Sequence, residues 1–410
     1  VGGNANTEES DAYPDWKKKT VLFLSGQAFS ILGSALVQYA IIWYITLNTK
    51  SGQMMTISAI FGFLPQIAVS IFAGVWADRY SRRLLIIFAD AMTALSTLVL
   101  AILFLMGYED IWLMFIVSGV RSLGAGIQTP AVNALLPQIV PPDKLARING
   151  INTTVLTLTM LVSPAVSGAL MSFAAIEAIF FIDVVTAAIA ISIMLALRVP
   201  LHKKAAEKQT IGYLDDLKAG MKYTLEHKFV RSLLVFYMVF FFLITPVAFL
   251  TPLLVARTFG EEVWRLTANE MFYFAGSIAG GMVLATWGGF KNRIFSITVA
   301  SISFGILTAA LGFSKIFWLY LASMFLEGVG IPFFSNPITV LLQEKVDMDM
   351  QGRVFGILQI VSSTALPLGM VVFGPLADAV SIELLLIITG VLMAVAGVSI
   401  PYNKGFRSVS

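Results

Sequence analysis

The chain has 410 residues, of which 58% are hydrophobic and 12% are charged, and its formal net charge is +3. A soluble domain carries about a quarter charged residues, so this composition, with a mean hydropathy of +0.85, excludes a soluble globular domain. The chain has no Cys, two His and no P-loop sequence, which excludes disulfide frameworks, zinc sites and an ATP site within it. We therefore expect no metal and no cofactor. We also expect no nucleic-acid partner, because the basic residues form no stripe.

Residues 1–16 are polar and acidic and are expected to form a disordered tail or an expression remnant. Twelve apolar stretches follow, each close to the roughly 20 residues that a helix needs to cross the hydrocarbon layer. They run over 20–47, 52–77, 84–106, 111–136, 145–172, 174–197, 229–256, 264–287, 294–313, 316–341, 354–377 and 381–400. Lipid cannot satisfy an open backbone, so each stretch must be helical. The sequence predicts an all-α polytopic membrane protein of twelve transmembrane helices.

The longest polar segment, 198–228, divides these helices into two six-helix bundles, over 17–197 and 229–400, with a cytoplasmic tail over 401–410. Within the segment, apolar residues recur at spacings of three and four, which predicts an amphipathic linker helix on the cytoplasmic face. They are Ile211, Leu214, Leu217, Met221 and Leu225.

The two bundles are related by an internal repeat. A shift of 206 positions aligns Arg147 with Arg353 and Gly168 with Gly374 without a gap. Such duplicated halves are typical of transporters whose halves rock around a central site. The repeat therefore predicts two pseudo-symmetric bundles working by alternating access.

The basic residues also predict the orientation. Most Lys and Arg fall in loops on the side that both termini share, whereas the opposite side holds only Lys50, Arg257, Arg265 and Lys315. By the positive-inside rule, both termini are cytoplasmic. The seven Trp lie near the ends of predicted spans, at headgroup depth.

The loop between the second and third predicted helices carries a motif. Its sequence, GVWADRYSRR, resembles the cytoplasmic G-x-x-x-D-R-x-G-R-R signature of the major facilitator superfamily, with Ser81 in place of the inner Gly. The matching residues are Gly74, Asp78, Arg79, Arg82 and Arg83. The resemblance implies a cytoplasmic gate, in which the glycine lets helices approach closely and the acid braces the start of the eleventh helix. The alternative is a basic loop that only sets topology.

Further stretches resemble one branch of that superfamily. SPAVSG, with Pro164 and Gly168, partly resembles the G-P-x-x-G-G motif of its antiporters. GQAFSILGSALVQYAIIWYIT, RSLGAGIQTPAVNALLPQIVPP, SPAVSGAL and LLQEKVDMDMQGRVFG resemble the macrolide-efflux branch, the third group of drug:proton antiporters. The resemblance runs from about Trp16 to Asp378.

This resemblance implies proton-driven efflux of macrolide-like compounds across a bacterial inner membrane, which would confer antibiotic resistance. We also expect the protein to be a monomer. Its partners would be a small amphipathic substrate, protons and the lipid bilayer. An exporter of an endogenous amphiphile, such as a siderophore or lipid, is the alternative among transporters. A membrane enzyme acting on lipid would need a catalytic cluster that neither His lies near, and the duplicated halves argue against a channel.

Charged residues inside predicted spans are costly and are seldom kept without a partner or a purpose. They are Asp90, Arg121, Asp183, Glu270 and Glu327. The repeat superposes Arg121 on Glu327 at the midplane, so we hypothesise that they face a central cavity from opposite halves and that Glu327 couples protons. A structural cation and a satisfied interhelical hydrogen bond are the respective alternatives. For Asp90 and Asp183, on helices that are peripheral in the superfamily, structural bonds are favoured. Glu270 lies near the outer end of the eighth helix, where one interpretation is that it is solvated when the carrier opens outward.

We expect apolar side chains of the seventh and tenth helices to form most of the substrate surface, because aromatic and Met surfaces adapt to varied ligands. The candidates are Met238, Phe241, Phe249, Phe333 and Phe334. The alternative is that these side chains face lipid or neighbouring helices.

Overall fold

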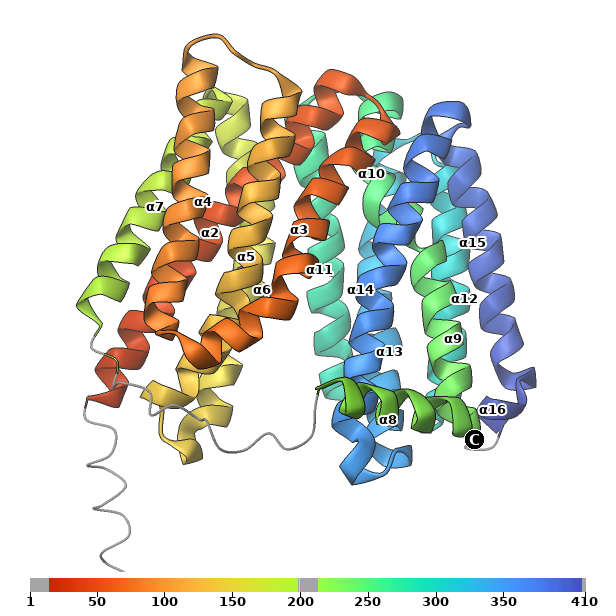
Figure 1. Cartoon of the computed structure of the whole chain (residues 1–410). Helices are drawn as coiled ribbons and strands as arrows, with labels where there is room; N and C mark the ends of the chain where they lie inside the picture. Colours follow the sequence, from red (N-terminus) through yellow and green to blue (C-terminus); the bar gives the residue numbers. More distant parts are fainter. Residues whose placement is uncertain (1–14, 198, 200–212, 408–410) are drawn as a thin grey trace, which may run out of the picture. The chain divides into compact units, whose positions relative to one another are not determined.

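The structure, a computed structural model, describes residues 15–197, 199 and 213–407 (Figure 1). For residues 71, 78 and 213–219 it describes the backbone alone. Throughout the described part the regular structure is helical, and long apolar helices dominate it. The expected tail over 1–16, all but its last two residues, lies outside the described residues.

The chain folds as two compact units. The first comprises the described residues of 1–45 and 57–208, and the second those of 46–56 and 209–410. The sequence placed 46–56 in the first bundle, whereas this segment, the tip of the first predicted hairpin, packs with the second unit. Long-range polar contacts, described below, account for the difference.

Six long helices form the first unit, apart from the tip. They are α2 (Trp16–Thr49), α3 (Gly52–Arg79), α4 (Arg82–Leu105), α5 (Ile111–Ile139), α6 (Leu145–Phe173) and α7 (Ile176–Ala196), with the short η1 (Pro142–Lys144) before α6. α4 packs along both α5 and α7. Trp43 is 1% exposed and packs beside Tyr39 in the interior of the unit. Its headgroup depth stays a prediction.

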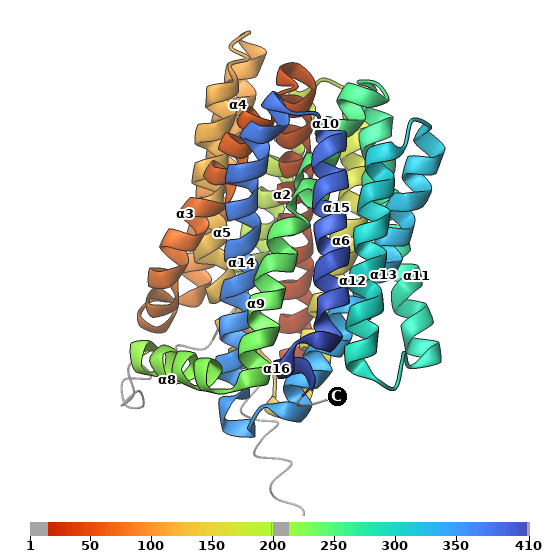
Figure 2. The same ribbon diagram turned by 90° about the vertical axis from the view of Figure 1, so that its right-hand side faces the viewer.

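The second unit begins with a surface helix and then repeats the pattern of long helices. Its helices are α8 (Tyr213–Glu226), α9 (Lys228–Leu243), α10 (Thr245–Thr258), α11 (Val263–Trp287), α12 (Arg293–Phe313), α13 (Phe317–Lys345), α14 (Met348–Ala379), α15 (Ile382–Ser399), η2 (Ile400–Tyr402) and α16 (Lys404–Arg407). α12 packs between α13 and α15, and α13 also packs on α11. α9 packs on α14, and α8 lies across their ends (Figure 2). Phe, Leu and Ile side chains form most of the core of this unit.

The seventh predicted helix is broken. The sequence predicts one span over 229–256, but the helix ends at Leu243 and restarts at Thr245. Pro246 occupies the first turn of α10, where it supplies no backbone N–H and so interrupts the ladder of hydrogen bonds.

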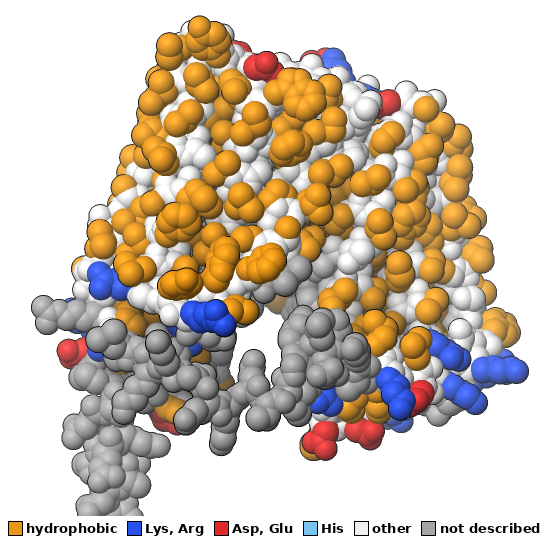
Figure 3. All heavy atoms as spheres, viewed as in Figure 1, with side chains coloured by type: hydrophobic (Ala, Val, Ile, Leu, Met, Phe, Trp, Pro, Cys, Tyr) orange, Lys and Arg blue, Asp and Glu red, His pale blue; other side chains and the backbone are white. Residues whose placement is uncertain are grey.

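Eleven of the described spans are long and apolar enough to cross a membrane, with α9 and α10 counted as one. The remaining predicted span, α11, has 25 residues but is less apolar, since it contains Arg265, Asn269 and Glu270. On the visible face of each unit, hydrophobic and uncharged side chains cover the helices, and charged side chains gather at the ends (Figure 3). These observations confirm an all-α polytopic membrane protein.

The described part of the predicted linker helix is α8. Gly220 and Thr224 are buried against the unit, whereas Met221 and Leu225 are 44% and 55% exposed. Exposed apolar side chains on a surface helix suit the boundary between membrane and water. Ile211 lies outside the described residues, and the side chains of Leu214 and Leu217 are not described.

Candidate functional site

A buried ion pair joins four helices of the first unit. Arg121 of α5 donates from Nη1 to Oδ2 of Asp183 on α7 at 2.5 Å, and from Nη2 to the Ser34 carbonyl of α2 at 3.1 Å. Thr97 of α4 donates to the same carboxylate oxygen at 3.0 Å. The Arg121 and Asp183 side chains are only 7% and 2% exposed. Because each charge is buried with its partner, this network is expected to fix how these helices pack.

A second network of the first unit surrounds Asp90 on α4. Ser30 of α2 and Gln128 of α5 both donate to its Oδ1, each at 2.7 Å. Its Oδ2 is buried and has no hydrogen-bond partner among the described residues. Asp90 and Asp183 thus make interhelical bonds, as favoured from the sequence, but only Asp183 has a cation beside it.

Glu327 lies on α13 of the second unit. Thr308 of α12 donates to its Oε1 at 2.9 Å, and the residue is 1% exposed. Its Oε2 has no partner among the side chains that the structure describes. Glu327 is therefore held between packed helices by an interhelical hydrogen bond, the alternative interpretation, and its role in a cavity stays a prediction.

The hypothesis that Arg121 and Glu327 face one cavity from opposite halves stays a prediction. The Arg121 guanidinium has its counter-charge inside its own unit, in Asp183. Superposition by the repeat identified two buried charges at equivalent positions, but it could not show that one of them was already neutralised.

The remaining predicted acid, Glu270 of α11, is half-buried. Asn269 donates to its Oε1 at 3.3 Å, and Tyr320 of α13 donates to Asn269 at 2.7 Å. These bonds tie α11 to α13 through a polar chain inside the unit. Solvation of Glu270 stays a prediction.

The loop motif contributes two helix-capping arginines. Arg82 donates to the carbonyls of Ala77 at 3.0 Å and Ala134 at 2.6 Å. Arg83 donates to Met194 at 2.7 Å and Leu195 at 2.5 Å, in the last turn of α7, where carbonyls lack intrahelical partners. Both arginines therefore brace the first unit itself.

The rest of the motif differs from expectation or is not described. Ser81 has φ −63° and ψ 114°, a conformation open to any residue, so the turn does not need the family's glycine. Gly74 and Arg79 are exposed, and a side chain at Gly74 would meet no atom within 4 Å. Among the described residues no neighbour therefore lies close to Gly74, and its role in a gate stays a prediction. The gate role of Asp78 falls on a side chain that is not described and stays a prediction.

The antiporter-like motif seats α6 inside the first unit. Pro164 and Gly168 are both buried, and between them Ser167 donates to the Leu36 carbonyl of α2 at 3.2 Å. Pro164 lies inside α6, which continues through it. The motif thus lies where α6 meets α2.

The predicted substrate residues differ in their exposure. Phe334 is 4% exposed and stacks on Phe240 at a centroid distance of 4.2 Å, so it belongs to the core. Phe241 packs on Tyr237 at 4.4 Å. Met238 is 45% exposed on the surface of the unit. Phe249 and Phe333 are half-buried. Phe334 is therefore corrected to a packing residue.

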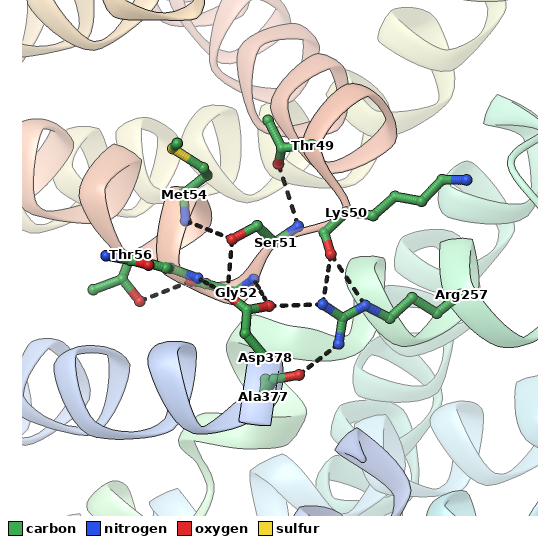
Figure 4. Close-up of polar contacts among 10 residues, drawn as sticks. Thr49, Lys50, Ser51, Gly52, Met54, Thr56, Arg257, Ala377 and Asp378 are labelled. Atoms are coloured by element: carbon green, nitrogen blue, oxygen red, sulfur yellow. Dashed lines mark hydrogen bonds and ion pairs between the residues drawn. The ribbon is translucent and has the colours of Figure 1, made fainter. Parts of the chain in front are cut away.

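A polar cluster that the sequence did not predict holds the tip of the α2–α3 hairpin (Figure 4). Asp378, near the end of α14, accepts hydrogen bonds from Ser51 Oγ at 2.7 Å and from the backbone N–H groups of Gly52 at 2.8 Å and Gln53 at 2.9 Å. It thereby caps the first turn of α3, whose N–H groups would otherwise lack partners. We call these residues, with Arg257, the Asp378 cluster.

Arg257 of α10 completes the Asp378 cluster. It donates to Asp378 at 2.7 Å and to the Lys50 carbonyl at 3.1 Å from Nε. Lys50 has φ 47°, a left-handed conformation rare outside glycine, and its ammonium pairs with Glu261. In the sequence, Arg257 is notable only because it lies on the side of the membrane that is poorest in basic residues. No sequence pattern near Arg257 links it to Asp378.

The comparisons with known proteins identify the family. The family model of the Major Facilitator Superfamily matches residues 23–370. "Macrolide efflux protein A" of Streptococcus pyogenes is 29% identical over 401 residues, covering 97% of this chain and 99% of that protein. "Macrolide efflux protein A" of Enterococcus faecalis is 30% identical over 322 residues, covering 78% of this chain and 100% of that protein.

A solved structure agrees on the fold. The nucleoside transporter NupG is 16% identical, with a TM-score of 0.65 over 95% of this chain and 99% of that one. At that identity the likeness concerns the fold alone. The family match over most of the sequence, together with the duplicated helical units, shows that the chain belongs to the Major Facilitator Superfamily and is a transporter, not an enzyme.

Proposed function

We propose that this transporter exports macrolide-like amphiphiles from a bacterial cell in exchange for protons, by alternating access. The observation that carries the proposal is similarity to macrolide efflux proteins over nearly the whole chain, at 29% and 30% identity. Export of an endogenous amphiphile is the alternative that shares this architecture.

The buried carboxyl groups differ in how well they suit proton coupling. Asp183 is paired with Arg121, so its charge is balanced inside the first unit. Asp90 and Glu327 each have one buried oxygen without a partner among the described residues. Burying an ionised carboxylate without a partner costs several kcal/mol of free energy, roughly, whereas burying the neutral acid avoids most of that cost. We therefore propose Asp90 and Glu327 as the groups that gain and lose the proton.

Coupling of proton transfer to substrate transport then requires that these carboxyl groups have different surroundings in the two conformations of the transporter. A ligand shifts a conformational equilibrium only through its different affinity for the two states. Opening a water path to Glu327 would favour its ionised form, and closing that path would favour the neutral acid. Substrate binding that closes the path would thus depend on the proton. The Arg121–Asp183 pair would keep the first unit rigid during the change.

Orientation, membrane and oligomeric state complete the proposal. The excess of Lys and Arg on the side of the termini supports cytoplasmic termini. We propose that the protein lies in the bacterial cell membrane, which its similarity to bacterial efflux proteins supports. We propose a monomer, because one chain contains both duplicated units.

The direct test uses the purified full chain in proteoliposomes with a fluorescent macrolide. We expect uptake or release of the macrolide to follow an imposed proton gradient and to stop when an ionophore collapses it. Transport unaffected by the ionophore would contradict proton antiport. No transport of macrolides under any gradient, with a stable folded protein, would contradict the substrate class and favour an endogenous amphiphile.

A further inference from the structure

The α2–α3 hairpin extends into both compact units. Its long arms pack in the first unit, where Arg121 of α5 donates to the Ser34 carbonyl of α2 at 3.1 Å. Ser122, also of α5, accepts a hydrogen bond from the Gln66 backbone N–H of α3 at 3.0 Å. The tip, residues 46–56, packs instead with the second unit. α2 and α3 therefore each cross from one unit into the other.

Both helices are continuous where they cross. The units divide after residue 45 in α2 and after residue 56 in α3, and neither helix ends there. The adjoining stretches 40–49 and 53–61 contain neither Pro nor Gly. Sharp kinks in long helices almost always need Pro, a Gly/Ser pair, a π-bulge or an inserted group. The tip is therefore rigidly joined to the arms, so motion between the units has to break the contacts of the tip with the second unit.

The Asp378 cluster holds the tip mainly through the backbone of the tip (Figure 4). Asp378 accepts hydrogen bonds from the N–H groups of Gly52 at 2.8 Å and Gln53 at 2.9 Å. Arg257 donates from Nε to the Lys50 carbonyl at 3.1 Å. Hydrogen bonds weaken steeply when their geometry is disturbed, so these bonds favour one position of the tip over all others.

Packing against α14 makes the fit of the tip close. Thr56 is 4% exposed, and its Oγ1 donates to the Met370 carbonyl of α14 at 2.9 Å. A side chain on Gly52 would collide with the Gly374 carbonyl oxygen, so the backbones of the tip and of α14 are in direct contact there. The tip thus has a specific seat on the second unit.

Release of the tip would leave no charge buried without a partner. Arg257 and Asp378 bind each other at 2.7 Å, and neither belongs to the tip, so this ion pair remains when the tip leaves. Lys50 of the tip pairs with Glu261, and these two side chains are 43% and 58% exposed, so water solvates both when they separate. Because removing one partner of a buried ion pair is what makes such a change costly, the arrangement suits contacts that break and re-form.

We propose that the Asp378 cluster is a latch that closes the end of the transporter at which α2 ends and α3 begins. The tip must leave its seat on the second unit before this end opens. The inference rests on the alternating access proposed above, but it depends neither on the substrate nor on the ion that drives transport.

A cysteine reporter measures release of the tip in the purified full chain, without any substrate. Thr56→Cys places a thiol in the seat on α14, where a maleimide reaches it only after the tip leaves. Adding Asp378→Ala removes the bonds to Gly52 and Gln53 and is expected to raise the labelling rate roughly 10- to 100-fold, because hydrogen bonds to charged groups stabilise by about such a factor. Adding Glu262→Ala instead removes an acid that pairs with Arg265 nearby, and this control should label at the rate of Thr56→Cys alone. Equal labelling of the Asp378→Ala variant and the control would overturn the latch.

A reversible cross-link tests whether release is required for transport. In the double variant Lys50→Cys/Glu261→Cys, a short bis-methanethiosulfonate reagent ties the tip to its seat, and no other thiol competes because the chain has no Cys. We expect the cross-link to stop macrolide transport in proteoliposomes and reduction to restore it. The control Glu262→Cys/Arg265→Cys takes the same cross-link within the second unit and should transport throughout.

Transport at an unchanged rate by the cross-linked Lys50→Cys/Glu261→Cys variant would show that the tip never leaves its seat, and would overturn the proposal. If neither the parent nor the reduced variants transport macrolides, the proposed substrate fails instead, and the labelling rates of Thr56→Cys alone decide on the latch.

Discussion

At the scale of single residues, the Arg121–Asp183 pair shows how a buried charge can be structural. Its two members lie on α5 and α7, and α2 and α4 supply the other hydrogen-bonding groups. Removing one partner leaves the other charge buried and unpaired, which costs about 3–5 kcal/mol. Replacing both by apolar residues avoids that cost.

We therefore expect Arg121→Met to lower the melting temperature and folded yield strongly. The double variant Arg121→Met/Asp183→Leu is expected to recover most of the loss. Thr97→Val, which removes only one hydrogen bond of the network, is the matched control and should cost about 1 kcal/mol. Thermal unfolding in detergent, followed by size-exclusion chromatography, measures all three. A double variant as unstable as Arg121→Met would show that the pair is not simply a neutralised charge.

Glu327→Gln tests proton coupling at one atom. The amide keeps the acceptor for Thr308, so we expect a melting temperature close to that of the parent. Export by the parent is expected to fall as external pH rises, because the inward proton gradient weakens. Export by the variant should not depend on external pH in this way, since its side chain cannot carry a proton. Glu344→Gln, an exposed acid on the same helix, is the control. A variant whose export keeps the parent's pH slope would remove Glu327 from the proton path.

At the scale of elements, the apolar runs predicted the helices well, because roughly 20 apolar residues have few alternatives in a membrane. The break between α9 and α10 could not be predicted from Pro246 alone. Helices α3, α5, α6, α13 and α14 all contain Pro and continue through it. Whether Pro breaks a helix depends on which neighbours satisfy the freed backbone groups, and that is a property of packing.

The Asp378 cluster was missed for a related reason. Asp378 and the N–H groups that it caps are 325 or 326 residues apart in the chain, so no local pattern links them. A sequence repeat identifies equivalent positions in the two halves of the chain. It does not identify a side chain of one helix that caps the first turn of another. The same limit hid Asp183 as the partner of Arg121.

We expect Arg257→Gln to loosen the tip of the α2–α3 hairpin from the second unit. Hydrogen bonds to charged groups contribute about 1.5–3 kcal/mol, so amide exchange over residues 50–56 should rise by roughly 10- to 100-fold. Arg265→Gln, whose guanidinium pairs with Glu262 nearby in sequence, is the control and should leave that exchange unchanged. Mass spectrometry of exchanged peptides reads both. Parent-like protection in Arg257→Gln would mean that packing alone holds the tip.

At the scale of the whole molecule, sequence duplication and folded units correspond closely but not completely. The repeat relates two sets of six spans, yet residues 46–56 pack with the second unit. Contacts made by Asp378 and Arg257 decide where this tip lies, whereas apolar periodicity decides only that α2 and α3 are helices. Fold class and family were therefore accessible from sequence. The partners of the buried charges required the three-dimensional packing.

Orientation in the membrane is the last prediction and concerns the whole chain. Because the sequence has no Cys, single cysteines can be introduced without background labelling. Tyr108, between α4 and α5, and Lys291, between α11 and α12, are both exposed. The distribution of Lys and Arg places Tyr108 outside the cell and Lys291 in the cytoplasm. A membrane-impermeant maleimide should therefore label Tyr108→Cys in intact cells, but should label Lys291→Cys only after permeabilisation. The reverse pattern would invert the topology, and labelling of both in intact cells would show that the predicted spans between them do not alternate.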